Sequence, residues 1–378
     1  MAMSLTKEAL LPIMQNYLTA SASQPSTMQE TQQQLLQYAN QPGFAASMAE
    51  IVRDQQNQPS PVRQLAAIML HRHVVEKRWD FGPSEQDDEV FPVSEDEKRV
   101  VREVLVQCIG DPVNRIRRQI AVLLGSIGGI EWPDVWPQLV QQIVGFMENA
   151  SQRQDGLSVI DGSLLTLISL AEQAGLETVI RLNREVLPVA LQILDANLQS
   201  HKLRGRTFHL LKSCVGSLKV PASVQGEESD HALQLIDELR VPLCRIIFTE
   251  IRKPYSRDTD IPSQQHALSI LQILIAEHPK SIEPAVTTII QELFQFLGRM
   301  REPFCRYVLL GEVEEETEGS HTHEADHEYD SEGEEHNMET VIEQALSVVC
   351  TIVGCTSKKV RKTVRRLYVC FWFLVIHS

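Results

Sequence analysis

Three residues of this sequence stand at the spacing of a zinc-protease motif: His323, Glu324 and His327 form the pattern H-E-x-x-H. On a helix this spacing places both imidazoles on one face, where they bind Zn²⁺ while the glutamate acts as a general base. The surrounding residues are charged rather than amphipathic, and no apolar helix precedes the motif, so nothing would exclude water from a metal. We therefore expect no metal centre here, only loose metal binding by His321, His323, His327 and His336.

The rest of the sequence also lacks the residue patterns of an enzyme. It contains no serine, histidine and aspartate arrangement, no glycine-rich phosphate-binding loop and no pair of carboxylates in an apolar context. Seven cysteines occur singly except for Cys350 and Cys355, without the spacing of a zinc site or a disulfide framework, which fits a reducing compartment. The sequence therefore predicts a protein without catalytic residues and without a cofactor.

Acidic residues are concentrated in two segments. Fourteen acids and no base lie between Arg306 and Lys358, and eight acids and no base lie between Arg78 and Lys98. Removing these 22 charges from the net charge of −15 leaves the remaining chain at +7. Unpaired carboxylates in a flexible segment attract a basic protein at long range, although a charge run can also be a solvated linker. The candidate residues for binding basic cargo are Glu312, Glu314, Glu315, Glu316, Glu318, Glu324, Asp326, Glu328, Asp330, Glu332, Glu334 and Glu335.

Two shorter features accompany the acidic segment. Ser331 is followed by acids and could be phosphorylated by an acid-directed kinase. The run from Lys358 to Arg366 carries six bases in nine residues, as a nucleic-acid or localisation patch would, but the polar face of a repeat helix is the favoured interpretation. With a net charge of −15, we expect no direct nucleic-acid binding.

Apolar residues at helical spacing predict six complete helical hairpins. Their helices are expected at 5–18 and 27–38, 44–52 and 62–79, 100–109 and 113–127, 135–147 and 157–174, 179–198 and 203–218, and 231–251 and 264–277. A seventh hairpin pairs residues 284–300 with residues 341–353 across the acidic segment, which we expect to be a mobile loop.

The second helices of these hairpins align on a charged residue. Arg63, Arg117 and Arg204 each follow an apolar residue in the same register, and Asp161 takes this place 44 residues after Arg117 and 43 before Arg204. A period in the low forties with two helices per unit is typical of HEAT repeats. The sequence therefore predicts an all-α solenoid superhelix of the HEAT/ARM type, built from stacked antiparallel helical hairpins.

The stretch Glu131-Trp-Pro-Asp-Val-Trp-Pro137 carries two of the four tryptophans, each followed by proline. Proline is tolerated in the first turn of a helix, so a helix is expected to begin near Asp134 or Val135. The large tryptophans should pack between that helix and the preceding one. Trp132, Pro133, Trp136 and Pro137 are therefore predicted to be structural residues.

Two stretches of this sequence and the position of its acidic loop resemble the importin-β (karyopherin-β) family of nuclear transport receptors. The helix from Ser60 to Trp79 is similar to the one that closes the family's N-terminal region, and the Trp-Pro pair is similar to one that opens a later repeat. The acidic loop inside the seventh repeat is the third likeness. The resemblance covers residues 4 to about 365. The last dozen residues match nothing expected, and members of the family are much longer chains.

The resemblance implies several protein partners. These are the small GTPase Ran in its GTP form, Phe-Gly nucleoporins on the outer helices, and basic cargo such as core histones inside the superhelix. By position, the second helices around Gln33, Arg63, Arg117 and Asp161 would face Ran. Shuttling between cytoplasm and nucleus through the nuclear pores is the implied localisation.

The sequence suggests six regions. They are an importin-β N-terminal-type region (1–79), an acidic insertion (80–97), repeats 3 to 7 (98–306), the acidic loop (307–339), the rest of repeat 7 with the start of repeat 8 (340–366), and an apolar tail (367–378). The tail is unlike a polar capping repeat, which indicates a truncated or alternatively ended chain. Its apolar run, Leu367 to Ile376, is about half the length of a membrane span, so we expect no membrane anchor.

Two other functions stay open from the residues alone. A helical-repeat scaffold without Ran dependence would share every repeat feature described above, and a truncated chain could be nonfunctional or compete with a full receptor. A metallopeptidase based on His323 and His327 is a distant third. A transport receptor and chaperone for basic cargo remains the favoured interpretation.

Overall fold

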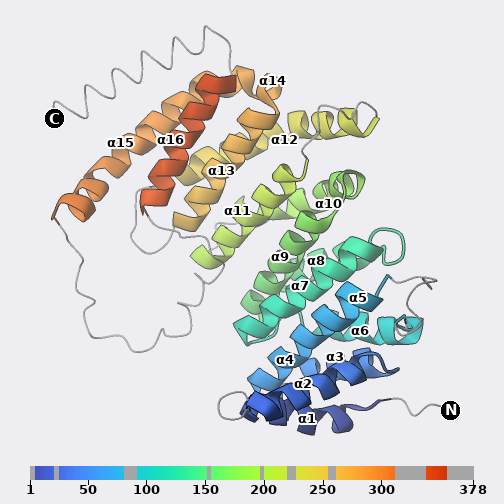
Figure 1. Cartoon of the computed structure of the whole chain (residues 1–378). Coiled ribbons are helices and arrows are strands. Elements are labelled where there is room, and N and C mark those ends of the chain that lie inside the picture. Colours follow the sequence, from blue (N-terminus) through green and yellow to red (C-terminus); the bar gives the residue numbers. More distant parts are fainter. Residues whose placement is uncertain are drawn as a thin grey trace. The chain divides into compact units, whose positions relative to one another are not determined.

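The structure is a computed structural model that describes residues 5–20, 25–80, 92–150, 155–195, 200–218, 227–253, 261–310 and 338–355. Every regular element in these ranges is a helix, and successive helices form hairpins (Figure 1). They group into two compact units, Met1–Thr178 and Val179–Ser378, each of which is described by itself below. The all-α prediction is confirmed.

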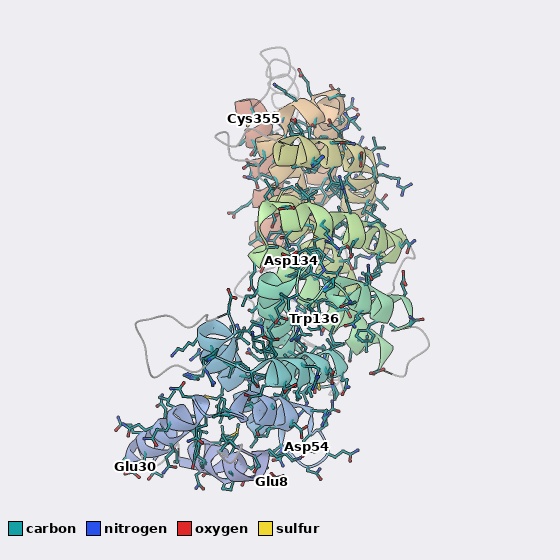
Figure 2. All side chains as sticks on the ribbon, turned by 90° about the vertical axis from the view of Figure 1, so that its right-hand side faces the viewer. Glu8, Glu30, Asp54, Asp134, Trp136 and Cys355 are labelled. Carbon is teal, nitrogen blue, oxygen red and sulfur yellow. The ribbon has the colours of Figure 1, made fainter. Side chains whose placement is uncertain are left out.

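In the part of unit 1 that the structure describes, the helices form four hairpins. The first helices are α1 (Lys7–Ala20), α3 (Phe44–Arg53), α6 (Glu95–Gln107) and α8 (Leu139–Glu148), and the second helices are α2 (Pro25–Ala39), α4 (Ser60–Leu70), α7 (Asn114–Glu131) and α9 (Gly156–Gln173). Helix α4 runs on through a π-helical turn, His71–Val75, into the short helix α5 (Glu76–Arg78). Figure 2 labels Glu8, Glu30 and Asp54 at the end of this unit that α1 to α3 form. These hairpins agree with those that the apolar periodicity predicts.

The described residues of unit 2 form three hairpins. They pair α10 (Leu176–Asp195) with α11 (His201–Gly216), α12 (Glu227–Ile251) with α13 (Ile261–Glu277), and α15 (Val286–Leu310) with α16 (Met338–Cys355). The short helix α14 (Pro279–Ile282) and a 3₁₀ turn at Glu283–Ala285 lie between the last two hairpins. Helix α13 packs against α11 on one side and α16 on the other.

Second helices stack on one another because a single hairpin cannot bury both of its faces. In unit 1, α7 packs against α4 and α9. A Cβ atom at Gly125 of α7 would collide with Ser169 of α9, and one at Gly162 of α9 would collide with the carbonyl of Ile109. These two glycines therefore allow neighbouring hairpins to approach to backbone contact.

The start of α8 differs from the prediction. The helix begins at Leu139, not near Asp134 or Val135. The amides of Val135 and Trp136 both donate to the carbonyl of Glu131, at 2.7 and 3.0 Å, and so close a turn over the intervening residues. The peptide bond between Trp132 and Pro133 is cis. The two prolines thus belong to the connection, and the helix starts after the second one.

The acidic insertion predicted at 80–97 is shorter at its C-terminal end. Ser94 is the N-cap of α6, and Glu95, Asp96 and Glu97 form the first turn of that helix. Carboxylates are favourable at this position because the N-terminus of a helix carries partial positive charge. Residues 81–91 lie outside the described residues.

The acidic loop predicted at 307–339 is also bounded differently. Helix α15 continues to Leu310, and α16 begins at Met338, so both ends of the predicted loop are helical. Residues 311–337 lie outside the described residues, as do residues 356–378 with the basic run and the apolar tail.

Candidate protein-interaction site

The residues that mark the second helices of unit 1 differ in exposure. Gln33 on α2 is exposed to solvent. The side chains at the other three marked positions are buried, with exposed fractions of 2% for Arg63, 5% for Arg117 and 2% for Asp161. Those three residues therefore identify the helices, but their side chains are not available to a partner.

The buried charges join successive hairpins as ion pairs. Arg63 of α4 pairs with Asp111 in the turn between α6 and α7, and its Nε donates to the carbonyl of Val52 at 2.8 Å. Arg117 of α7 pairs with Asp161 of α9 through Nε and Oδ2, also at 2.8 Å. These partners are 48 and 44 residues apart in the chain, close to the repeat period. Each pair thus links one hairpin to the next.

Unit 2 repeats this arrangement. Arg204 of α11 pairs with Glu250 of α12, with Nη1 and Oε2 separated by 3.1 Å. Arg252, directly after α12, donates from Nε to Oε2 of Glu292 on α15 at 2.8 Å. Arg252 holds the pKa of Glu292 below its ordinary value through this hydrogen bond. The charged positions that share a register in the sequence are therefore positions at which one hairpin contacts the next.

A groove lies on the second helices of unit 1, beside the π-helical turn. It has a volume of about 700 Å³. Its lining residues are His71, Val75, Glu76, Lys77, Arg78, Asp80, Val122, Ser126, Gly129, Ile130 and Gln173. They come from the end of the α4 to α5 helix, from α7 and from the last residue of α9. A π turn within an α-helix is rare and frequently occurs at a functional site.

Apolar and charged residues share the groove. Val122 and Ile130 of α7 are 37% and 42% exposed and form an apolar wall. Glu76, Lys77 and Asp80 are exposed at its rim. An apolar surface with a mixed-charge rim is suited to a protein segment rather than to a small anion or metal.

The two histidines of the π turn, His71 and His73, lie in different surroundings. His71 forms a hydrogen bond from Nε2 to the hydroxyl of Ser126, at 3.2 Å, and its Nδ1 lies 3.3 Å from Glu76. Burial lowers the pKa of His73, and the nearby charges of Lys77 and Arg72 lower it further. The contacts of His71 therefore help to fix the turn that borders the groove.

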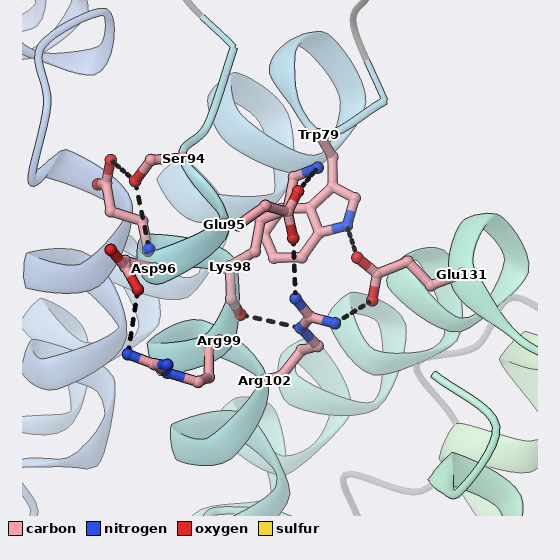
Figure 3. Close-up of polar contacts among 9 residues, drawn as sticks. Trp79, Ser94, Glu95, Asp96, Lys98, Arg99, Arg102 and Glu131 are labelled. Carbon is pink, nitrogen blue, oxygen red and sulfur yellow. Dashed lines mark hydrogen bonds and ion pairs between the residues drawn. The ribbon is translucent and has the colours of Figure 1, made fainter. Parts of the chain in front are cut away.

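The Trp-Pro stretch is connected to the other stretch that carries the family likeness. Trp79 donates its indole N–H to Oε1 of Glu131 at 2.9 Å, and Arg102 lies 3.4 Å from Oε2 of the same carboxylate (Figure 3). Burial raises the pKa of Glu131, although Arg102 and the indole act in the opposite direction. The guanidinium of Arg102 also lies 6.0 Å from the ring centroid of Trp136. Glu131, on the third hairpin, thus binds the end of the second hairpin through Trp79.

The burial predicted for the tryptophans is confirmed. Trp132 and Trp136 are both buried, and Pro133 and Pro137 are partly exposed. In Figure 2 the label of Trp136 marks its place among the helices of unit 1. These four residues therefore shape the connection between α7 and α8.

Other predicted site residues fall where the structure says nothing of them. The acids from Glu312 to Glu335 and the histidines of the H-E-x-x-H pattern lie outside the described residues. In the ranges given above, no three His, Cys, Asp or Glu side chains come together as a metal site. None of the described helices has both the length and the apolar character of a membrane span.

Sequence reasoning missed the groove. The π turn leaves no mark in the apolar periodicity, which reads through it as one continuous helix from 62 to 79. One signal was present: Val122 and Ile130 are apolar residues outside the buried stripe of α7. Exposed apolar residues eight positions apart on one helix could have indicated a binding surface.

Three comparisons with known proteins agree with this picture. Residues 31–111 match the model of the importin-beta N-terminal domain. The chain is 24% identical to Importin-9 of Drosophila melanogaster over 368 residues, which cover 96% of this chain and 33% of that protein. The chain therefore spans about a third of the length of this relative.

Solved structures share the fold. The exportin Cse1 in its cargo-free, cytoplasmic state aligns with a TM-score of 0.61 and 13% identity, over 94% of this chain and 35% of that one. Kap95p, whose binding induces the switch loops of RanGDP to adopt the GTP-bound conformation, aligns with a TM-score of 0.54 and 15% identity, over 94% and 42% of the two chains. The chain thus has the HEAT-type solenoid fold, carries an importin-β N-terminal domain and is homologous to Importin-9 along almost its whole length, which confirms the resemblance to the importin-β family.

Proposed function

We propose that this chain acts as a nuclear transport receptor that binds Ran in its GTP form and carries or chaperones basic proteins such as core histones. The observation that supports the proposal most is the match of residues 31–111 to the importin-beta N-terminal domain, because that segment supplies one side of the groove. In this proposal the role is one of binding, without an enzymatic step. Phe-Gly nucleoporins would meet the first helices, and the receptor would shuttle through nuclear pores.

Ran-GTP is proposed to contact the exposed residues of the second helices in unit 1. Gln33 is one such residue, and the apolar wall of the groove offers Val122 and Ile130. Burial of apolar surface is the dominant favourable term in most protein–protein association. The ion-paired Arg63, Arg117 and Asp161 would support these helices from within.

The first test is the binding of this chain to Ran loaded with GTP or GDP at physiological salt. We expect binding to the GTP form alone. Ile130→Asp should weaken it by roughly tenfold or more, because it places a charge where an apolar contact forms. Val135→Asp is the matched control, since Val135 is 60% exposed in the same unit but does not line the groove.

Two outcomes would contradict this proposal. A folded chain that binds neither form of Ran would favour a repeat scaffold without Ran dependence. Equal weakening by Ile130→Asp and Val135→Asp would remove the groove from the Ran-binding surface.

Basic cargo is proposed to be attracted by the acids between Glu312 and Glu335. Replacing these acids by Gln and Asn should slow the association with a core histone dimer by at least roughly tenfold at low salt, with a smaller effect at high salt. Stopped-flow measurements at several salt concentrations would show this. Glu8→Gln with Glu30→Gln is the control, because both acids are exposed on helices α1 and α2 far from that segment in sequence. An association rate that stays unchanged at low salt would refute the role of the acids.

A further inference from the structure

We propose that Ser94 is a phosphorylation site for an acid-directed serine/threonine kinase, and that its phosphate releases Glu97 from the second hairpin. Ser94 is exposed and is followed by Glu95, Asp96 and Glu97. Among the serines and threonines that the structure describes, it alone has acids at all three following positions. A kinase with basic residues beside its active site recognises such carboxylates by charge-assisted hydrogen bonds. This inference does not depend on the proposed function.

A phosphate on Ser94 would lie beside the side chain of Glu97. Its hydroxyl accepts a hydrogen bond from the amide of Glu97 and also lies 3.3 Å from Oε2 of that side chain (Figure 3). The other oxygen of the carboxylate, Oε1, accepts from the backbone N–H of Gly43 at 2.9 Å.

The bond to Gly43 joins two hairpins. Gly43 is the N-cap of α3, has a φ of 89° and offers no side chain for capping. Positive φ is the reason for a glycine here. Helices α3 and α6 pack against each other, and Glu97 ties their first turns together. The carboxylate next to Ser94 is therefore part of a contact between the second and third hairpins.

Phosphorylation changes the charge at this point. The kinase forms a bond between Oγ of Ser94 and the terminal phosphorus of a nucleoside triphosphate, the bond from that phosphorus to its bridging oxygen breaks, the hydroxyl proton passes to the kinase or water, and the nucleoside diphosphate leaves. The phosphate carries about −1.5 to −2 charges at neutral pH. It repels the carboxylate of Glu97, while the first N–H groups of α6 donate hydrogen bonds to the phosphate oxygens. Helix α6 thus stays capped, and Gly43 loses its acceptor.

The site is tested by treating the full chain with a purified acid-directed kinase and MgATP, followed by site-resolved mass spectrometry. We expect a phosphopeptide that contains Ser94 and disappears in Ser94→Ala. Ser47 is the matched control, because Glu50 follows it three positions later but its side chain is buried. A synthetic peptide of residues 92–99 checks the kinase. A phosphorylated peptide with no modification of Ser94 in the folded chain would overturn the proposal.

The consequence is tested by hydrogen exchange at the amide of Gly43. Phosphorylation should speed its exchange roughly tenfold, the change expected for the loss of a hydrogen bond to a charged acceptor. Unphosphorylated Glu97→Ala, which also removes the acceptor of Gly43, should show the same faster exchange. An exchange rate at Gly43 that phosphorylation leaves unchanged would overturn the release of Glu97.

Discussion

Arg117→Ala should lower the free energy of unfolding of unit 1 by about 3 to 5 kcal/mol. The substitution leaves the carboxylate of Asp161 buried without the guanidinium that lies 2.8 Å from it. Removing one partner of a buried ion pair costs far more than the net gain from the intact pair. Arg117 also donates to the carbonyl of Asp111, so a contact within its own hairpin is lost as well. Denaturant titration followed by circular dichroism would measure the change.

Two further variants test whether the cost of Arg117→Ala arises from breaking a buried ion pair. Arg53 pairs with Glu50 at 3.1 Å, but their side chains are 46% and 38% exposed, so Arg53→Ala should cost less than about 1 kcal/mol. Replacing Arg117 by Met together with Asp161 by Leu should recover much of the loss, because apolar residues then take the place of both members of the pair. A cost for Arg117→Ala as small as that for Arg53→Ala would show that the Arg117 pair does not support the stack.

Trp79→Ala should destabilise unit 1 by about 3 to 5 kcal/mol, as expected for removing a large buried aromatic side chain. Trp79 is among the largest fully buried side chains, and it also supplies a hydrogen bond to the buried Glu131. Thermal or denaturant unfolding of the purified chain would give the value. A melting curve that barely moved would mean that the indole contributes little to the core.

Trp79→Phe is the matched control for the hydrogen bond. Phenylalanine keeps most of the apolar volume but removes the N–H that Glu131 accepts, so we expect a cost of about 1 to 3 kcal/mol. The difference between the two variants then measures packing alone. If Trp79→Phe and Trp79→Ala lowered the free energy of unfolding equally, the whole effect would come from the lost hydrogen bond to Glu131. That result would contradict a contribution from packing of the indole.

The repeat was predictable because burial imposes periodicity. Each helix must present an apolar stripe to its neighbours, and the spacing of these stripes in the sequence predicts the hairpins of both units. The start of α8 was missed for a local reason. Proline is tolerated at the first helical position, but it is equally suited to a turn, and only the closure of residues 132–136 on the carbonyl of Glu131 decides between the two.

The roles of Arg63, Arg117 and Asp161 could be recognised only from the structure. A charged residue on a helix is usually solvated, so there was no reason in the sequence to expect these three side chains to be buried. Arg63 pairs with Asp111, and Arg117 pairs with Asp161, and in both cases the two partners lie in different hairpins. The sequence alone does not show which helices meet. Recurrence of a charge in an otherwise apolar register was the available signal.

The ion pairs between hairpins give each unit the thermodynamics of a one-dimensional lattice. Each pair crosses the boundary between two neighbouring hairpins and contributes to the coupling energy between them. The apolar contacts inside a hairpin stabilise that hairpin alone. A defect at Arg117 therefore weakens one boundary, that between the third and fourth hairpins, and leaves the couplings on either side intact. Loss of one partner of a buried pair should therefore make the array divide first at the boundary that the pair crosses, before the hairpins on either side unfold.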